Sequence, residues 1–333
     1  MPENILDIGI TIVLFFQNLG DWLSSPTQFF TFLGSEEFYL FVAPAIYWCM
    51  DASIGLKVGL FVMLSASLND ALKVTFHGPR PYWYDLGVRA LSFESSFGLP
   101  SGHAQNAVVV WGTFAAALNR GWVWIGSIIV MFLIGLSRLY LGVHFPSDVV
   151  VGWLTGALIL WVILKLETPV MNWLNQNNPG MQIIIALTVS LILILVGLVS
   201  RSSLDDWTIP SSWVQNAAAP EAAPIDPLSR SRLVSSAGAF FGLAAGAIVL
   251  ENRGGFNVRG AWWKRVVRFL VGLAGVILIW SGLGAILPRG EYLSALSLRY
   301  LRYSLIGFWV TGLAPALFIH SKLAESKRNL GVK

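Results

Sequence analysis

Three cationic side chains stand where apolar stretches of the sequence end. Lys73 and Arg80 follow one apolar run, and Arg138 lies near the end of another. A cation deep in a membrane-spanning segment costs roughly 2.5–3.5 kcal/mol on insertion scales, so any one of them is more simply explained by a long side chain that reaches the lipid headgroups. The helix topology predicted below places all three on one face, and this convergence favours a common site for an anion.

The residues Pro-Ser-Gly-His at positions 100–103 open the apolar run that follows. Proline, serine and glycine are favoured at a helix start, where free backbone N–H groups and the helix dipole bind phosphate. The glycine lets an anion approach the backbone closely, and an arginine can bind two phosphate oxygens whereas a lysine supplies a point charge. Taken alone, the four residues are better explained as an ordinary helix cap. Together with Lys73, Arg80 and Arg138 they predict a phosphate site.

His144 and Asp148 are four residues apart across Pro146, which is expected to begin a helix. Asp148 can then hold one ring nitrogen of His144 and leave the other to attack an electrophile, the arrangement of a nucleophile with a supporting carboxylate. His103 would be a second titrating group, which could protonate a leaving oxygen. The alternative is a satisfied polar pair at the membrane interface, but that reading leaves His103 and the three cations unexplained.

These residues form three motifs that resemble the signature of the type 2 phosphatidic acid phosphatase superfamily, which also includes bacterial acid phosphatases and vanadium haloperoxidases. Eleven fixed positions match in the same order: Lys73-x6-Arg80-Pro81, Pro100-Ser101-Gly102-His103 and Ser137-Arg138-x5-His144-x3-Asp148. The resemblance covers about residues 40–200 and implies a six-helix core. The residues after about 231 lie outside the pattern.

The resemblance implies a two-step hydrolysis of a phosphate ester that uses neither a metal nor another cofactor. By this similarity His144 is the nucleophile that forms a phosphohistidine, Asp148 is its partner and His103 is the general acid. The residues that would hold the phosphate are Lys73, Arg80, Ser101, Gly102 and Arg138. The sequence shows no obvious cluster of carboxylates of the kind that holds Mg²⁺ or Ca²⁺.

The composition is that of a membrane protein. Apolar residues make up 55% of the 333 residues and charged residues only 12%, about half the usual charged share, and the mean hydropathy is +0.66. These values exclude a soluble enzyme, a nucleic-acid-binding module and a disordered chain. The one cysteine, Cys49, cannot form an internal disulfide and is expected to pack as a small hydrophobic residue.

Apolar runs that approach the ~20 residues needed to cross a bilayer predict an all-α, polytopic fold. Nine spans are expected, at residues 37–50, 53–75, 103–118, 122–142, 148–166, 181–200, 232–250, 266–287 and 303–319. Residues 1–36 are predicted to form an N-terminal interfacial helical segment, with a true first span as the alternative. A six-span core at 37–200, a Pro/Ala-rich, poorly ordered connector at 201–231 and a three-span extension at 232–333 complete the predicted organisation.

The distribution of positive charge predicts which side each loop faces. The helix ends at 51–57, 119–121, 165–180, 251–265 and 320–333, together with Arg268, carry 12 of the 22 Lys and Arg residues and only 4 of the 18 Asp and Glu residues. The positive-inside rule places this face in the cytoplasm, so the loop at 76–100 and the turn at 143–147 are extracytoplasmic. Aromatic residues of that loop are expected to form an interfacial belt, with a lid as the less favoured alternative. They are Tyr82, Trp83, Tyr84, Phe93 and Phe97.

The sequence therefore predicts an integral phosphatase of the cell membrane that acts on a lipid or isoprenoid phosphate monoester, because a catalyst at membrane level favours a substrate already in the bilayer. A polyprenyl diphosphate phosphatase is the alternative within the class. A non-catalytic lipid-phosphate-binding or transport protein is the alternative from another class, although binding alone would need only the cations and not His103, His144 and Asp148. Membrane lipids are expected partners and nucleic acid is not.

The oligomeric state is left open by the sequence. Gly238, Gly242 and Gly246 recur at a spacing of four residues. Small residues at this spacing let two helices approach closely. Packing within one chain is the favoured interpretation, and a seam between two copies of the chain is the alternative.

Overall fold

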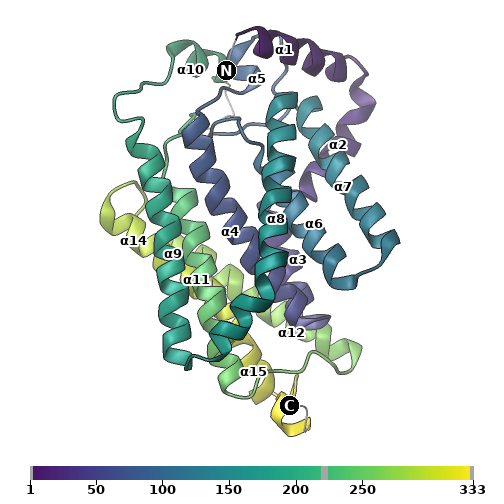
Figure 1. Ribbon diagram of the computed structural model, residues 1–333, viewed down its shortest axis with the longest axis vertical. Coiled ribbons are helices and arrows are strands. Elements are labelled where there is room, and N and C mark those ends of the chain that lie inside the picture. The colour runs from purple at the N-terminus through teal and green to yellow at the C-terminus, as the bar shows by residue number, and fades with distance from the viewer. Residues whose placement is uncertain (1–2, 219–223, 331–333) are drawn as a thin grey trace. The chain divides into compact units, whose positions relative to one another are not determined.

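The computed structural model describes residues 3–218 and 224–330, and these residues fold into helices (Figure 1). In this part of the chain an isolated antiparallel bridge pairs Asn257 with Glu325. The prediction of an all-α fold is therefore confirmed. In chain order the helices are α1 (Glu3–Gln17), η1 (Asp21–Leu23), α2 (Ser24–Phe32), α3 (Glu36–Cys49), α4 (Ala52–Phe76), α5 (Pro81–Tyr84), α6 (Gly102–Leu118), α7 (Gly121–Tyr140), α8 (Pro146–Asn175), α9 (Pro179–Ser202), α10 (Ser211–Ala217), α11 (Ser231–Asn252), α12 (Trp262–Ile277), η2 (Leu278–Gly282), α13 (Leu283–Ile286), α14 (Leu293–Phe308), η3 (Trp309–Leu313), α15 (Ala314–His320) and η4 (Lys327–Leu330).

Helices occupy all nine positions where spans are predicted. Among the described residues, seven helical stretches are long and apolar enough to cross a membrane: Ala52–Tyr84, Gly121–Tyr140, Pro146–Asn175, Pro179–Ser202, Ser231–Asn252, Trp262–Ile286 and Leu293–His320. The other two, α3 and α6, have only 14 and 17 residues. The last span begins at Leu293 rather than near residue 303. It includes Arg302, whose guanidinium lies 5.0 Å from the ring centroid of Tyr303.

Local sequence decides where the helices around the predicted site begin. Pro146 is the first residue of α8 and Pro179 the first of α9, a position where the missing N–H of proline costs no hydrogen bond. Ser101 is the N-cap of α6, and its side chain accepts the backbone N–H of Ala104 at 3.4 Å. The helix starts expected from the motifs are therefore present.

The N-terminal residues fold as two helical pieces, α1 and η1–α2, which are bent by 89° relative to each other. Leu6, Ile10 and Val13 of α1 are buried in a hydrophobic core that includes Tyr140 of α7. The two pieces together are also long and apolar enough for one broken span. The interfacial location of this segment therefore stays a prediction.

The chain forms two compact units, each assembled from stretches that are separated in the sequence. The first unit contains residues 1–38, 68–162 and 196–229, and the second contains residues 39–67, 163–195 and 230–333. All residues predicted to bind or attack phosphate fall in the first unit. The site can therefore be described within that unit alone.

Part of the stretch predicted to be a poorly ordered connector is folded. Residues 211–217 form α10, which packs on α5 within the first unit. The ring of Trp213 lies 6.1 Å from the ring of Trp83. This part departs from the expectation because its tryptophan, Trp213, packs against the hydrophobic core of the first unit. Residues 219–223, which contain Pro220 and Glu221, lie outside the described residues.

In the second unit the glycine repeat of α11 faces α14 and η3. A Cβ on Gly238 would lie 2.6 Å from the carbonyl oxygen of Tyr300, and a Cβ on Gly246 would lie 3.0 Å from the backbone nitrogen of Gly312. Larger residues at these positions would push the helices apart. The small-residue spacing is thus used for close packing within the chain, as favoured from the sequence.

Candidate active site

The charged residues of the three motifs meet in the first compact unit. Lys73 lies in the last turn of α4, Arg80 directly precedes α5, and Arg138 lies in the last turn of α7. His144 occupies the turn between α7 and α8, and Asp148 lies in the first turn of α8. Each of these five residues is at most 3% exposed. Their charges therefore act on one another with little screening by water.

Asp148 holds the ring of His144. The Nδ1–H of His144 donates to Oδ2 of Asp148 at 3.2 Å, and the same oxygen accepts the backbone N–H of Phe145 at 3.0 Å. The turn that carries His144 depends on Gly142. Its φ is +73°, and a Cβ at this position would lie 2.5 Å from the carbonyl oxygen of Arg89. Only glycine fits this conformation and this space. The contact expected from the spacing of four residues is present.

The second ring nitrogen of His144 faces a cation. Its Nε2 lies 3.2 Å from Nη1 of Arg80, which also donates to the carbonyl oxygen of Val143 at 2.9 Å. A guanidinium can only donate, so Nε2 must be the acceptor and Nδ1 must carry the proton. In this tautomer the Nε2 lone pair is directed at Nη1 of Arg80.

The surroundings of His144 keep its ring neutral. Burial, followed by the charges of Arg80, Lys73, Arg138 and His103, holds the pKa of His144 well below its usual value. A neutral imidazole retains the lone pair that a nucleophile needs. His103, half-buried in the first turn of α6, is therefore electrostatically coupled to His144. The two predicted titrating groups are therefore close enough for one to affect the pKa of the other, and the catalytic role of His103 stays a prediction.

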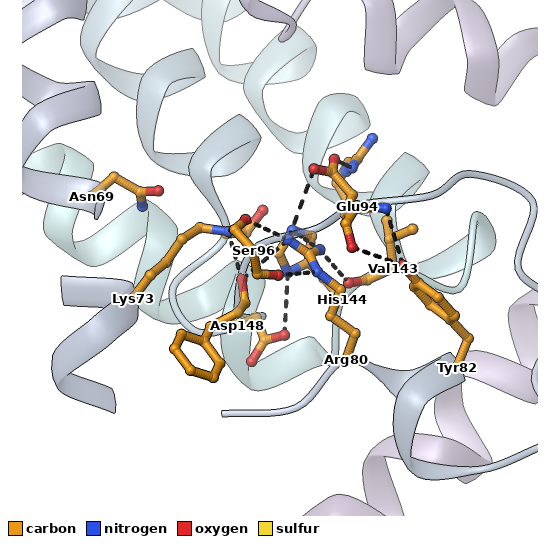
Figure 2. A network of polar contacts seen from close by, with 12 residues as sticks. Asn69, Lys73, Arg80, Tyr82, Glu94, Ser96, Val143, His144 and Asp148 are labelled. Carbon is orange, nitrogen blue, oxygen red and sulfur yellow. Dashed lines mark hydrogen bonds and ion pairs between the residues drawn. The ribbon is translucent and has the colours of Figure 1, made fainter. Parts of the chain in front are cut away.

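A short segment before α6 receives hydrogen bonds from two of the cations. Lys73 Nζ donates to Oγ of Ser96 at 3.0 Å and to the carbonyl oxygen of Phe97 at 2.6 Å. Arg80 Nε donates to the carbonyl oxygen of Ser96 at 2.6 Å, and its Nη2 donates to Oγ of Ser96 and to the carbonyl oxygen of Phe97, each at 3.1 Å. Figure 2 shows the two side chains converging on Ser96 beside His144. This segment fixes where the two positive charges lie.

Arg138 binds two groups that sequence reasoning did not identify. Its Nη2 donates to Oε1 of Glu94 at 2.6 Å, and its Nη1 donates to Oγ1 of Thr31 in α2. The other carboxylate oxygen of Glu94 lies 3.9 Å from Nη2 of Arg80. Glu94 could have been suspected as an acid in a loop whose flanking motifs are cationic. Thr31 could not, because 107 residues separate it from Arg138.

The start of α6 is held from two sides. The backbone N–H of Ser101 donates to the carbonyl oxygen of Asp148 at 2.9 Å. Asn69, one turn before Lys73 on α4, donates through Nδ2 to Oε1 of Gln105 at 3.0 Å. A Cβ on Gly102 would lie 2.9 Å from Oδ1 of Asn69. A side chain at position 102 would therefore have to move the Asn69 amide.

Three of the aromatic residues predicted to form an interfacial belt are buried instead. Tyr82, Trp83 and Phe97 are at most 3% exposed and belong to one hydrophobic core. The ring of Phe97 lies 5.6 Å from that of Trp207, and the hydroxyl of Tyr82 donates to the carbonyl oxygen of Glu94 at 3.0 Å. The belt prediction is wrong for these three residues, because their rings pack on the loop that carries the site rather than facing lipid.

Comparison with known proteins places the chain in a family. Two family models match it: the PAP2 superfamily over residues 54–172, and the PAP2 superfamily phosphatase, transmembrane extension, over residues 234–326. The chain is 30% identical over 155 residues to phosphatidylglycerophosphatase B of Bacillus subtilis (strain 168), a match that covers 43% of this chain and 74% of that protein. The chain belongs to the PAP2 superfamily and is an integral membrane protein.

Two other relatives share shorter parts of their length with the chain. Glucose-6-phosphatase 3 of Homo sapiens is 28% identical over 186 residues, covering 48% of this chain and 54% of that protein. Undecaprenyl-diphosphatase of Sulfolobus acidocaldarius is 31% identical over 117 residues, covering 34% of this chain and 56% of that protein. The chain thus spans about half the length of these two relatives.

Proposed function

We propose that the chain is an integral-membrane phosphatase that hydrolyses a lipid or isoprenoid phosphate monoester through a phosphohistidine intermediate. The observation that carries this proposal is the setting of His144, whose Nδ1–H is held by Asp148 while its Nε2 faces Arg80. An oriented, neutral imidazole beside a phosphate-binding cation is suited to attack phosphorus.

The phosphate would be bound by positive charge from several elements. Lys73, Arg80 and Arg138 supply three cations, and the start of α6 adds the backbone N–H of Gly102 and the hydroxyl of Ser101, whose own N–H donates to Asp148. Guanidinium groups bind phosphate oxygens in pairs, and a helix start favours negative charge. These groups also stabilise the charge that develops on the phosphoryl oxygens during transfer, because they are already in place before the reaction.

In the first step, Nε2 of His144 attacks phosphorus. The N–P bond forms as the bond from phosphorus to the leaving alcohol oxygen breaks, and His103 donates a proton to that oxygen. The carboxylate of Asp148 stabilises the positive charge on the phosphorylated ring. In the second step, water attacks phosphorus and gives its proton to His103, while the N–P bond breaks and returns its electron pair to Nε2. Inorganic phosphate leaves and both histidines regain their starting forms.

A lipid substrate is proposed because the site lies at the ends of membrane-spanning helices. A relative named phosphatidylglycerophosphatase B supports a lipid monoester, and a relative named undecaprenyl-diphosphatase supports an isoprenoid diphosphate as the second candidate. A relative named glucose-6-phosphatase 3 makes a soluble sugar phosphate a necessary comparison. A panel of all three substrate types, with phosphate release as the readout, separates these possibilities.

The central experiment measures phosphate release by the purified chain in detergent and EDTA, for wild type and for His144→Ala. The expected result is turnover by wild type and loss of turnover in the variant. His320→Ala is the matched control, because His320 is an exposed histidine of the second unit. Full activity of His144→Ala would remove the nucleophile assignment, and abolition of turnover by EDTA would contradict metal independence. Phosphate binding without any turnover would favour the non-catalytic alternative.

The active site is proposed to face the extracytoplasmic side, because the opposite loops carry most of the positive charge. Leu86 is 79% exposed in the site loop, and Arg259 is exposed in the short positive loop. In a Cys49→Ser background, a membrane-impermeant thiol reagent applied outside intact cells should label Leu86→Cys and not Arg259→Cys. Labelling of Arg259→Cys alone would reverse the proposed orientation.

A further inference from the structure

Glu94 lies between two of the cations proposed to bind phosphate. Its Oε1 accepts from Nη2 of Arg138 at 2.6 Å, and its Oε2 lies 3.9 Å from Nη2 of Arg80. Only 16% of its side chain is exposed. Figure 2 shows Glu94 beside the group of side chains that contains Arg80, Ser96 and His144. A negative charge thus lies among the groups on which the proposed chemistry depends.

The backbone of Glu94 is fixed as firmly as its side chain. Its N–H donates to the hydroxyl oxygen of Tyr82, and the Tyr82 hydroxyl donates to the carbonyl oxygen of Glu94, both at 3.0 Å. Tyr82 is itself 3% exposed and directly follows Pro81 in α5. Because Arg80 also directly precedes this helix, the same short element positions both the arginine and the acid that approaches it.

The residues after Glu94 extend this pattern. The Ser96 hydroxyl and the carbonyl oxygens of Ser96 and Phe97 accept hydrogen bonds from Lys73 and Arg80. The segment 94–97 therefore presents oxygen atoms to all three cations. A tetrahedral phosphate presents oxygen atoms in the same way, but the carboxylate of Glu94 is the one member of the segment with a negative charge.

Glu94 and a phosphate dianion cannot both pair closely with Arg138 and Arg80. Two anions held together in a buried place repel each other strongly, and the carboxylate already binds Nη2 of Arg138, one of the nitrogens that a bidentate phosphate contact can use. A ligand must therefore displace Glu94. The cost of displacing Glu94 is the same for every ligand, and the repulsion that remains is larger for a dianion than for a monoanion.

We propose that Glu94 is an internal competitor for the phosphate site: it pairs with Arg138 and approaches Arg80, so an anionic ligand must displace it and binds more weakly than the three cations alone would allow. This inference rests on the proposed function, because it assigns Arg80 and Arg138 to phosphate binding. Glu94 is neither the nucleophile nor a proton donor in the mechanism above. It lowers the affinity of the site for an anion.

The test uses Glu94→Gln, which keeps the shape of the side chain and removes its charge. Isothermal titration with inorganic phosphate at pH 8 should show binding about tenfold tighter than in wild type, the effect of relieving a moderate like-charge contact. Dimethyl phosphate, a monoanion, should gain less than inorganic phosphate does, because the repulsion that the substitution removes scales with the charge of the ligand. Glu291→Gln is the matched control, because Glu291 pairs with Arg230 in the second unit. Its phosphate affinity should equal that of wild type.

Weaker or unchanged phosphate binding in a folded Glu94→Gln protein would overturn the proposal, since it would make Glu94 a supporting partner of Arg138 rather than a competitor. If that variant does not fold, Tyr82→Phe gives the same test by loosening the backbone of Glu94, and it should also tighten phosphate binding. A Tyr82→Phe protein that binds phosphate no more tightly than wild type would equally overturn it. The readout is binding and not turnover. Failure of the proposed function would appear separately, as wild-type protein that binds phosphate but releases none from any substrate.

Discussion

The substitution Asp148→Asn tests the catalytic reasoning most directly, because it can remove a charge while leaving the geometry in place. Asp148 is fully buried, and its Oδ2 accepts both His144 Nδ1–H and the N–H of Phe145. An asparagine carbonyl oxygen can accept the same two hydrogen bonds. Oδ1 of Asp148 has no hydrogen-bond partner among the described residues. The NH2 group of an asparagine placed at that position would therefore not face a hydrogen-bond donor. The change is therefore mainly electrostatic.

The size of the effect follows from the distance between the two groups. A carboxylate oxygen lies 3.2 Å from His144 Nδ1, and a unit charge pair at this range is worth about 4–5 kcal/mol at an effective dielectric constant near 20. The positive charge on the ring forms only as the N–P bond forms, so the substitution removes stabilisation from the transition state and not from the bound substrate. This predicts a fall in kcat by a factor of about 10³–10⁴. KM should change little, because Asp148 has no proposed contact with the phosphate.

The assay is the initial rate of phosphate release under saturating substrate, with thermal melting in detergent to confirm that the variant is folded. Asp205→Asn is the matched control, since Asp205 is exposed in the stretch between α9 and α10. The control should keep wild-type kcat. A folded Asp148→Asn protein with kcat within tenfold of wild type would refute the view that this carboxylate stabilises the charged ring.

Three other measurements test the site. Burial and nearby cations lower the pKa of His144, so kcat/KM should stay constant as pH falls through 6.5 and decline only below it. The stability contributed by the neutral ring should be full above the pKa of the unfolded state and should be lost as pH falls toward the pKa of the folded state. A decline of kcat/KM that begins above pH 6.5 would contradict this. Gly142→Ala should cost about 1–3 kcal/mol of stability, seen as a lower Tm, because φ is +73° and the Cβ would meet a carbonyl oxygen, whereas Gly126→Ala, where a Cβ meets nothing within 4 Å, should not lower it; equal Tm values would disprove the strain. Arg138→Lys should raise KM about 10-fold or more through loss of a bidentate contact, and an unchanged KM would remove Arg138 from phosphate binding.

Short-range parts of the site follow from sequence spacing. His144 and Asp148 are one helical turn apart, so the contact between them needs only that a helix begin at Pro146. Ser101 likewise caps α6 because its own side chain reaches the N–H of Ala104. Local geometry of this kind is set by a few neighbouring dihedral angles, and a motif is enough to predict it.

The helices themselves were also predictable, but their functional surroundings were not. Apolar runs mark the helices because the backbone in a bilayer must satisfy its own hydrogen bonds. Periodicity could not show that Tyr82, Trp83 and Phe97 turn inward, or that α14 begins ten residues before the expected span. Burial of an aromatic ring depends on which other segments are near it, and hydropathy along the chain carries no information about that.

The amino-acid sequence by itself determined that this is a helical membrane protein with cations and two histidines at the ends of its helices, because composition and spacing act locally. Only the tertiary structure decided what those cations bind. Arg138 contacts Glu94 across 44 residues and Thr31 across 107. The partner of a charge is chosen by the path of the chain through space, since an ion pair requires closeness and not any fixed separation in sequence.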